Sequence, residues 1–280
     1  VVTGCLATRD PELVRRAAPA ALVVGNEKKD SIPALLGCRP VPDEAALRAF
    51  AGKSRAFLKV QDGCDMSCSY CIIPSVRPEL TSKPAAQVLA EARSLVERGY
   101  QELVLCGIRL GRYLDDGGER RLDFISLFEA LLALPGDFRL RLSSFEVTDA
   151  TERFLDAAEA AGPKFCPSFH LPLQSGSEAV LRRMNRWYTA AFYARRIESL
   201  RRRFPEAGLF TDLLTGFPGE TVAEHAENRA FVEKAGFSGL HVFRYSARAG
   251  TPAAGRRDAL PEPLVVARAE EFRRLDGVLR

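Results

Sequence analysis

Hydrophobic and polar residues repeat one pattern from Ala56 onward: a short apolar run, then a longer stretch with apolar positions at helical spacing. The short runs predict strands at residues 56–61, 102–107, 138–144, 168–173, 208–216 and 239–246. The longer stretches predict helices at residues 84–98, 122–134, 150–161, 177–183, 190–203 and 222–235. Six strands that alternate with helices predict an α/β fold, an open (β/α)6 partial TIM-like barrel whose chemistry lies at the C-terminal ends of its strands.

Local signals mark the ends of several predicted helices. Thr221 and Glu224 have the T-x-x-E spacing of a capping box, and Gly236 stands where a glycine commonly ends a helix. Pro84 suits a first helical turn. Thr189 is a candidate N-cap for the arginine-rich helix that follows it. These helices therefore have boundaries that the sequence itself predicts.

The beginning of the chain follows a different pattern. Residues 1–5 and 21–25 predict short buried strands, residues 11–18 predict a helix between them, and another helix begins at 32–36. Two parallel strands are too few for a stable domain. We therefore expect the C-terminal part of a small α/β domain whose earlier part is missing here, with a linker at 39–51.

We accordingly divide the chain into three parts. Residues 1–48 belong to the partial α/β domain, and residues 49–255 form the six-unit core. Residues 256–280 form a Pro-containing loop and a charged amphipathic helix. A chain of 280 residues is long enough for one large domain plus such a fragment.

Composition excludes several classes of protein. With 46% hydrophobic and 27% charged residues, the chain is typical of globular proteins and unlike disordered or disulfide-stapled ones. No apolar run reaches the ~18 residues of a membrane span and no secretion signal is visible, so we expect a cytoplasmic protein without membrane contact. The net charge is +4. The 33 arginines against seven lysines suit phosphate contacts or simply reflect genome base composition.

Cys64, Cys68 and Cys71 stand directly after the first strand of the core. Three thiolates on one loop can hold an iron-sulfur cube, and a four-iron cluster then keeps one iron open for a cofactor. Tetrahedral zinc is an alternative, but it needs a fourth ligand and no histidine lies nearby in the sequence. A second alternative is that the three cysteines are inert buried thiols. Spacing and position favour a [4Fe-4S] cluster.

Other cysteines and a histidine have simpler interpretations. Cys106 and Cys166 flank apolar runs, so we expect small buried hydrophobic residues there. Nothing in the sequence indicates a role for Cys38. His170 ends a predicted strand, where a lone histidine is more often a hydrogen-bonded structural residue than an acid or base.

The cysteine loop, with Tyr70 as the aromatic residue before its last cysteine, resembles that of the radical S-adenosylmethionine (SAM) enzymes. Longer motifs resemble the methylthiotransferases among them: LKVQDGCDMSCSYCIIP, RLRLSSFEV, HLPLQSGSEAVLRRMNRWYT, TGFPGET and YSARAGTPAA. They are most similar to enzymes that put a methylthio group on C2 of N6-threonylcarbamoyladenosine next to the tRNA anticodon. The resemblance covers about residues 1–280.

The resemblance implies which residues carry the reaction. Cys64, Cys68 and Cys71 would hold the [4Fe-4S] cluster that binds SAM and cleaves it reductively to a 5′-deoxyadenosyl radical. Cys5 would be the third ligand of a second [4Fe-4S] cluster that delivers sulfur, and its two partner cysteines lie upstream in the family.

Further positions are implied to bind SAM, and each has an ordinary structural alternative. Gly107 lies in the loop along the SAM amino group, or is a simple strand-end turn. Arg186 can pair with the SAM carboxylate, or is a surface arginine. Glu146 and Gln174 end strands on the cofactor side, or are solvated loop residues. The remaining positions are Tyr70 and, in the loop that packs the adenine in the family, Gly216 and Gly219.

The implied partners are tRNA, an electron donor of the flavodoxin or ferredoxin type, and a sulfur source. A group of arginines in one strand-helix unit predicts contacts with RNA phosphates, although a solvated helix face is the better interpretation for residues 201–203. The group consists of Arg182, Arg183, Arg195, Arg196, Arg201, Arg202 and Arg203.

Other functions remain open. Related enzymes act on isopentenyladenosine in tRNA or on an aspartate of a ribosomal protein, and a different class is a non-catalytic cluster-holding or RNA-binding remnant. Arg77 is followed by Pro78-Glu79-Leu80, where the family has Arg-Gly and a basic ending, so RNA contacts there are in question. Because relatives continue upstream and into a tRNA-gripping β-barrel, we expect a fragment or a truncated homologue.

Overall fold

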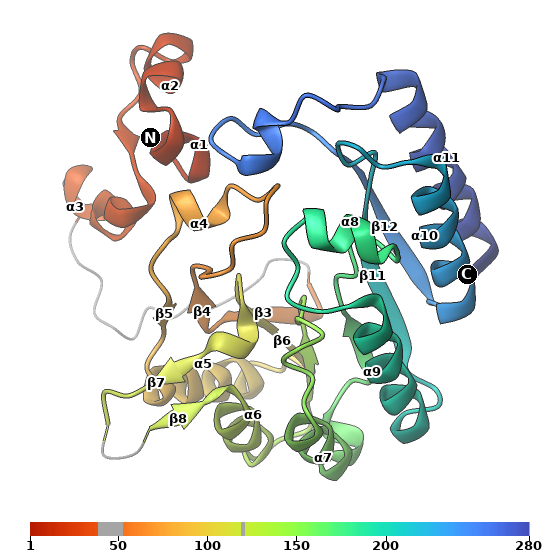
Figure 1. Ribbon diagram of the computed structural model, residues 1–280. Helices are drawn as coiled ribbons and strands as arrows, with labels where there is room; N and C mark the ends of the chain where they lie inside the picture. The colour runs from red at the N-terminus through yellow and green to blue at the C-terminus, as the bar shows by residue number, and fades with distance from the viewer. Residues whose placement is uncertain (39–52, 119–120, 280) are drawn as a thin grey trace.

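The computed structural model describes residues 1–38, 53–118 and 121–279 (Figure 1). Six parallel strands form its centre, in two sheets of three. A parallel bridge between Ser144 and His170 joins the two sheets, so the strands follow one another in sequence order. Within the described residues no pairing joins the first strand to the last, and the (β/α)6 arrangement is open as predicted. The strands are β3 (Arg55–Lys59), β6 (Glu102–Cys106), β9 (Arg139–Leu142), β10 (Ser168–His170), β11 (Gly208–Thr215) and β12 (Gly239–Arg244).

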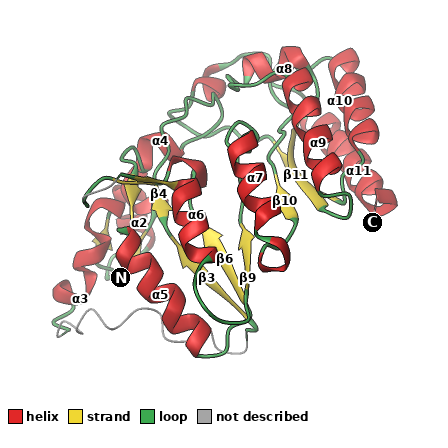
Figure 2. Ribbon diagram, turned by 90° about the horizontal axis from the view of Figure 1, so that it is seen from below, coloured by secondary structure: helices red, strands yellow, loops and turns green. Residues whose placement is uncertain are grey.

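Helices cover the outer side of this arc of strands, as Figures 1 and 2 show. Each predicted helix of the core is present, and two have the predicted bounds unchanged. The covering helices are α5 (Ala85–Glu97), α6 (Phe124–Leu132), α7 (Glu152–Ala160), α9 (Ala190–Arg203), α10 (Val222–Ala235) and α11 (Glu262–Leu279). The short α8 (Glu178–Arg183) precedes α9. Short elements that the periodicity did not predict are α4 (Ile73–Val76), β4 (Gln61–Asp62), β5 (Thr81–Ser82), β7 (Leu114–Asp115) and β8 (Leu122–Asp123).

The two faces of the sheet differ in burial, most clearly along β11. Leu209 and Leu213 point to the helices and are buried in the main hydrophobic core, whereas Phe210, Asp212 and Leu214 lie on the opposite, inner face and are only partly buried. Alternate residues of a strand point to opposite faces. Full burial of a leucine side chain contributes about 1.5–3 kcal/mol. The outer face therefore stabilises the fold, and the inner face is left for polar residues.

Phenylalanines fill the space between α6, α7 and the sheet. The ring centroids of Phe124 and Phe145 lie 5.1 Å apart, and those of Phe145 and Phe154 lie 4.9 Å apart. Phe128 and Phe165 meet edge to face at 5.6 Å. Tilted and edge-to-face pairs at such distances contribute beyond the area that they bury. This packing holds the strand ends of the first half of the core in place.

The predicted helix signals act as expected, with one shift. Thr221 and Glu224 form a complete capping box at the start of α10, and Gly236 ends that helix in the left-handed conformation with φ 59°. The Thr189 side chain accepts a hydrogen bond of 3.0 Å from the Phe192 backbone at the start of α9. Pro84 is the N-cap of α5 rather than its first helical residue, because its ψ of 136° is extended.

The N-terminal segment pairs β1 (Val2–Thr3) with β2 (Val23–Val24) in parallel, as predicted. The prediction that these strands are buried is wrong except at Val24, because the segment has too few elements to cover them. Its helices are α1 (Cys5–Arg9), which the sequence analysis missed, α2 (Pro11–Ala17) and α3 (Ile32–Leu35). The segment contacts the core through the Asn26 side chain, which donates to the Val76 carbonyl at 3.1 Å, and through Lys29, 3.0 Å from Asp62. The predicted linker at 39–51 lies outside the described residues, and the domain boundaries stay predictions.

The last helix, α11, fastens the end of the sheet. Arg268 donates to the Glu220 carboxylate at 2.6 Å and to the Glu220 carbonyl at 2.9 Å, and both side chains are buried. Phe272 is fully buried in the main core. Among the described residues, none of the helices combines the length and the apolar character that a membrane span requires.

Glu224 gives a prediction about acid stability. Its hydrogen bonds with Arg183 hold the pKa of this carboxyl at about 2, against an ordinary value of 4.5. A lowered folded-state pKa means that the stabilisation is complete above about pH 4.5 and is lost as the pH falls through about 2. We expect Glu224→Gln to lower the free energy of unfolding by about 1 kcal/mol at pH 7. The difference from the wild type should shrink between pH 4.5 and pH 3 in thermal unfolding. A difference that does not change with pH would contradict this explanation.

Candidate functional site

The cysteine loop follows β3 and β4 and lies at the C-terminal ends of the parallel strands (Figure 1). The side chains of Cys64 and Cys68 are buried, with 9% and 7% exposure, and Cys71 packs against them. Met66 and Tyr70 complete this small cluster. The three cysteines that the sequence singled out are therefore brought together, at the edge where an α/β sheet of this kind holds its chemistry.

The donor set of the loop favours a cluster over a single ion. Structural zinc is held by four ligands in a tetrahedron, and the fourth is commonly a histidine when three are cysteines. The three histidines of the chain are engaged elsewhere, His170 and His241 with Asp212 and His225 with Glu271. Three thiols on one loop fit a four-iron cluster with one sulfur on each of three irons.

Burial raises the pKa of the Cys64 thiol and of the Cys71 thiol. The free thiols are therefore poor nucleophiles, and a bound metal would be needed to hold them as thiolates. Backbone groups already point to these sulfurs: the Met66 amide is 3.5 Å from Cys64 Sγ, and the Ile73 backbone hydrogen-bonds Cys71. Such donors stabilise thiolates that carry a metal.

A turn that joins α8 to α9 holds the cysteine loop in shape. The Ser69 amide donates to the Met184 carbonyl at 2.9 Å, and the Ser69 hydroxyl donates to the Arg183 carbonyl at 2.8 Å. The Asn185 side chain donates to both the carbonyl and the hydroxyl of Ser67 at 2.8 Å. Asn185 has φ 55°, a left-handed conformation that asparagine tolerates better than most residues. The sequence analysis did not find this anchor.

Arg186 lies at the centre of the site. Its side chain, 3% exposed, contacts Glu146 at 2.5 Å, Cys68 Sγ at 3.2 Å and the Tyr188 hydroxyl at 3.2 Å. Burial opposes the charge of the guanidinium, but Tyr188, Glu146 and Tyr70 raise the pKa of Arg186 well above its usual value. Arg186 and Glu146, distant in sequence, therefore meet beside Cys68 as a buried ion pair. The guanidinium is not a surface group, so its surface alternative is wrong.

Gly107 packs against the strand that leads to the cysteine loop. A side chain at Gly107 would come within 3.1 Å of Gln61. Gln61 is buried, donates to the Gly63 carbonyl at 2.9 Å and accepts from the Arg109 amide at 2.8 Å. Gln61 thus ties the loop after β6 to the residues just before Cys64. Close approach, rather than a positive φ, favours a glycine here, because any larger residue would push on Gln61.

Gly216 and Gly219 shape the loop after β11. Both have positive φ, 72° and 75°, and a Cβ on Gly216 would meet Val265 of α11 at 2.7 Å. Between them Phe217 is fully buried, and Tyr70 packs against the cluster that contains it. The loop therefore lies against the aromatic residue of the cysteine loop, a contact that the sequence did not predict.

Gln174 also adopts a left-handed conformation, with φ 67°. It lines a cavity of about 250 Å³ next to the cysteine loop, together with Tyr70, Asp212, Tyr245 and Arg248. Of the sequence-predicted SAM positions, Arg186 contacts Cys68 and binds Glu146. Tyr70 packs against the cysteine cluster and lines this cavity together with Gln174.

Cys5 lies apart from the three-cysteine cluster, at the start of α1. Arg77 Nε is 3.4 Å and Asn26 Nδ2 is 3.8 Å from Cys5 Sγ. The same Arg77 binds both oxygens of Asp62 at 2.7 Å. In the loop around Arg77, whose sequence departs from that of the family, the Arg77 side chain thus contacts both Asp62 and Cys5. Two hydrogen-bond donors on a partly exposed thiol fit a metal-bound thiolate.

A polar group on the inner face of the sheet was not predicted as a group. His170 Nε2 and His241 Nδ1 lie 2.9 Å and 3.2 Å from the same oxygen of Asp212, and His170 Nδ1 is 2.7 Å from the Ser144 hydroxyl. These contacts bear out the interpretation of His170 as a hydrogen-bonded residue. Register brings them together, because Asp212 pairs with His241 and His170 pairs with Phe210, two residues earlier on β11.

Three of the seven arginines of the group bind acidic side chains of other helices. Arg183 binds Glu224 through two hydrogen bonds of 2.7 and 2.8 Å, and Arg196 binds Glu152 at 2.6 Å. Arg203 contacts Glu152 at 2.9 Å and Glu159 at 3.3 Å. These arginines are neutralised by acidic neighbours, so they do not form a free positive surface for phosphates.

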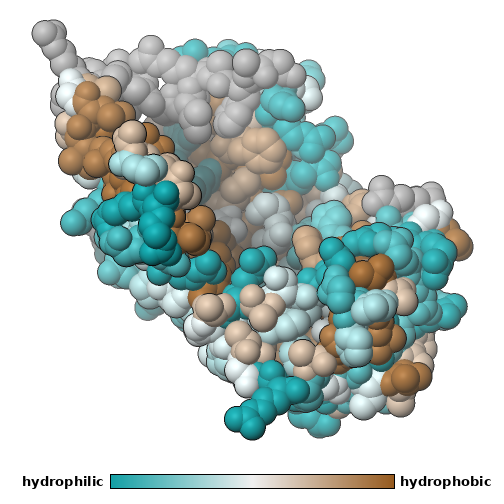
Figure 3. All heavy atoms as spheres, turned by 90° about the horizontal axis from the view of Figure 1, so that it is seen from above, coloured by the Kyte–Doolittle hydropathy of each residue, from teal (hydrophilic) through white to brown (hydrophobic). Residues whose placement is uncertain are grey.

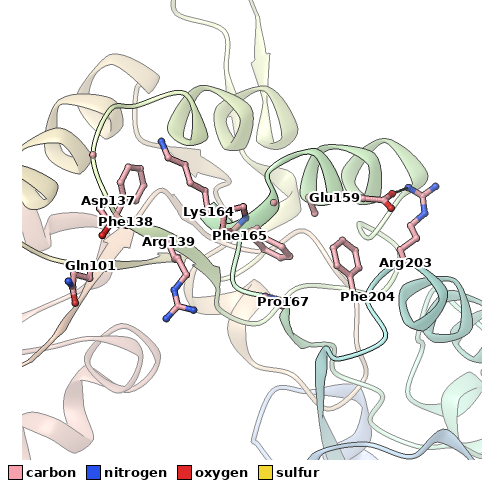
Figure 4. A pocket seen from close by; sticks show the side chains of 14 residues that line it. Gln101, Asp137, Phe138, Arg139, Glu159, Lys164, Phe165, Pro167, Arg203 and Phe204 are labelled. Atoms are coloured by element: carbon pink, nitrogen blue, oxygen red, sulfur yellow. Dashed lines mark hydrogen bonds and ion pairs between the residues drawn. The ribbon is translucent and has the colours of Figure 1, made fainter.

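The surface is hollowed elsewhere as well as at the cavity beside Gln174. Seen from above, a depression separates the mass on the left, where the N-terminal segment lies, from the mass that carries the C-terminal helices (Figure 3). A second cavity, of about 900 Å³, opens at the N-terminal ends of the strands, where Phe138, Lys164, Phe165 and Arg203 line it (Figure 4). This cavity lies at the end of the sheet opposite to the cysteine loop, so it is not part of the site.

Comparison with known proteins identifies the fold and its relatives. The model of the Radical SAM superfamily matches residues 58–232. A threonylcarbamoyladenosine tRNA methylthiotransferase MtaB from Chlamydia pneumoniae is 39% identical over 96% of this chain, and one from Thermotoga maritima is 37% identical over 94%. A tRNA-2-methylthio-N(6)-dimethylallyladenosine synthase from Cereibacter sphaeroides is 36% identical over 99%. The chain spans 62 to 65% of the length of these relatives.

Solved structures support the same fold. The cobalamin-dependent S-adenosylmethionine radical enzyme OxsB matches 97% of this chain and 42% of its own, with a TM-score of 0.63 and 13% identity. Coproporphyrinogen III oxidase from Escherichia coli, titled a radical SAM enzyme, matches 82% of this chain and 54% of its own, with a TM-score of 0.56 and 17% identity. At such low identity the likeness concerns the fold alone.

The anchor at Asn185 generates a prediction about metal retention. Asn185→Gly keeps the left-handed turn without strain but removes both hydrogen bonds to Ser67. Each such bond contributes about 1 kcal/mol. After anaerobic reconstitution, we expect the visible absorbance of the variant to decay several-fold faster in the presence of a chelator. Arg182→Ala, at an exposed neighbouring position, is the control. Equal decay in the wild type and both variants would show that this anchor does not hold the loop.

Proposed function

Because this chain belongs to the Radical SAM superfamily, we propose that it forms the radical-generating core of a tRNA methylthiotransferase. The proposed reaction transfers a methylthio group to C2 of N6-threonylcarbamoyladenosine next to the anticodon. One observation carries the proposal: relatives named for this reaction are 35–39% identical along 93–96% of the chain, across the segment that builds the cysteine site. The chain spans 61–63% of the length of those relatives. We therefore propose the complete methylthio transfer for this core acting together with the segments that the longer relatives have in addition.

Cys64, Cys68 and Cys71 are the proposed ligands of the [4Fe-4S] cluster, a cofactor of the family together with SAM. When bound, this pair supplies a 5′-deoxyadenosyl radical through one-electron cleavage of the carbon-sulfur bond of SAM. The chain's own contribution is shape and electrostatics. Met66 and the Asn185 turn hold the thiols in place, and the buried guanidinium of Arg186 donates a hydrogen bond to Cys68 Sγ at 3.2 Å.

Arg186 is the proposed partner of the SAM carboxylate. Its guanidinium is kept charged in a buried place, where an ion pair is stronger than in water. Glu146 occupies that guanidinium at 2.5 Å, so a ligand carboxylate has to share or replace this contact. Gly107, Gln174, Gly216 and Gly219 are proposed to line the rest of the cofactor site, with Tyr70 beneath the loop of the two later glycines.

Cys5 is the proposed ligand of a second [4Fe-4S] cluster, with Asn26 and Arg77 as hydrogen-bond donors to its sulfur. The other ligands, a sulfur source, a flavodoxin or ferredoxin type of electron donor and the tRNA substrate are proposed on the same basis. The proposed division of the chain remains 1–48 for the partial N-terminal domain, 49–255 for the core and 256–280 for the C-terminal loop and helix.

A second substrate has support from one observation. Relatives named for methylthiolation of dimethylallyladenosine in tRNA are 36% identical over 98–99% of this chain. This identity is within a few per cent of that to the threonylcarbamoyl enzymes. The two substrates share the purine ring and the position that is modified, and differ in the group on N6. The core described here would serve either.

The cysteine loop gives the first test of this function. The reconstituted protein, with dithionite and SAM under anaerobic conditions, should release 5′-deoxyadenosine, and Cys68→Ala should release about 100-fold less because one iron loses its ligand. Cys106→Ala is the matched control, since Cys106 lies outside the three-cysteine cluster. Product from Cys68→Ala at the wild-type level would refute the assignment.

The substrate gives the second test. Mass spectrometry of tRNA nucleosides from a strain that lacks the gene should show loss of methylthio-threonylcarbamoyladenosine, with its unthiolated precursor in its place. Re-expression of the wild type, but not of Cys68→Ala, should restore it. An unchanged threonylcarbamoyl product and a missing dimethylallyl product would assign the second substrate instead.

A further inference from the structure

Trp187, the single tryptophan of the chain, is presented to solvent beside the cysteine loop. It directly follows Arg186, whose side chain touches Cys68, and 50% of its surface is exposed. The preceding turn is bonded to Ser67, so the position of the indole is fixed by the loop itself. An exposed tryptophan held at the edge of a reaction site contributes little to the core and is available to a ligand.

Arg109 lies beneath this indole. Its guanidinium carbon is 5.0 Å from the centre of the ring, and the residue is only 4% exposed. Its contacts to Asp65 and Asp149 are long, 3.5 Å and 3.3 Å, and among the described residues its buried Nε has no hydrogen-bond partner. The arginine is therefore held as much by stacking as by hydrogen bonds. A cation over one face of an indole orients the ring and leaves its other face for a further partner.

The charges around the indole are balanced. Asp65 contacts both Arg109 and Arg112, and Asp149 contacts Arg109. Arg186 is paired with Glu146. Without an excess of positive charge, this surface has little to offer a phosphate. A flat aromatic face of this kind binds unpaired bases by stacking, which tolerates any base because every base has a π-face.

We propose that Trp187, backed by Arg109, is a stacking platform for one unpaired nucleobase of the RNA substrate, on the ring face opposite to the guanidinium. The proposal rests on the proposed function and adds a contact to it. The platform is one residue from the group beside Cys68, so a base bound there lies next to the nucleotide presented to the radical site. It positions RNA and takes no part in the chemistry.

The fluorescence of Trp187 provides a direct test. An anticodon stem-loop RNA, titrated into the reconstituted protein, should quench tryptophan emission, because a stacked base quenches indole fluorescence. Trp187→Phe removes the single tryptophan of the chain, so the RNA-dependent quenching of tryptophan emission should disappear in this variant. A blunt RNA duplex has no unpaired base and should not quench Trp187.

Binding measured by the anisotropy of labelled RNA gives the second readout. Trp187→Ala should bind the stem-loop about ten-fold more weakly, and Trp187→Phe should stay close to the wild type, because phenylalanine still stacks. The slope of log K against log salt should be unchanged in Trp187→Ala, since no phosphate contact is removed. Val278→Ala, which truncates another exposed apolar residue, is the control and should bind normally.

The outcomes separate this proposal from the proposed function. Stem-loop binding with unchanged affinity in Trp187→Ala and no quenching of Trp187 overturns the platform and leaves the methylthiotransferase intact. Quenching by SAM alone but not by RNA also overturns it, because the indole then stacks on the cofactor. A wild type that binds no tRNA stem-loop overturns both. Quenching by the stem-loop, together with weaker binding and an unchanged salt slope, supports the platform.

Discussion

The site depends first on the hydrogen bonds between the cysteine loop and the turn that follows α8. The loop has no regular secondary structure around Cys64 and Cys68 to set its shape. Ser67 and Ser69 are instead bonded to residues 183–185 at 2.8 to 2.9 Å, more than 110 positions later in the chain. Backbone groups of a largely buried loop must find partners, and the turn after α8 supplies several of them, together with Arg77 and Ala253. Residues 183–185, in the second half of the core, therefore fix the conformation of the loop that carries Cys64 and Cys68 in the first half.

Buried arginines fasten the other loops at the same edge of the sheet. Arg186 holds Glu146, Arg109 contacts Asp149, and Arg268 holds Glu220. The guanidinium is always charged and presents a rigid fork of donors, so it fixes the carboxylate it binds. Loss of one partner from such a buried pair leaves an uncompensated charge and costs about 3–5 kcal/mol. These pairs make the loops rigid at the place where a cofactor needs a preorganised environment.

Asp62 joins the N-terminal segment to the core. Lys29 of that segment, Lys59 of β3 and Arg77 after the cysteine loop all bind its carboxylate, which holds the pKa of Asp62 far below its usual value despite its burial. Arg77 also contacts Cys5. The arginine that looked like part of an altered RNA contact in the sequence thus joins Asp62 of the core to Cys5 of the N-terminal segment.

The sequence by itself determined the strand-helix order, the capping of α10 and the cysteine loop, because these depend on neighbours within a few residues. The resemblance of its motifs also indicated the family. Only the tertiary structure decided which distant side chains meet: Arg186 with Glu146, Asp212 with two histidines, and Trp187 with Arg109. It also showed that Arg183, Arg196 and Arg203 are neutralised by carboxylates from other helices. Spacing along the chain reports local periodicity, whereas these pairs depend on how the sheet curves and on the register of its strands.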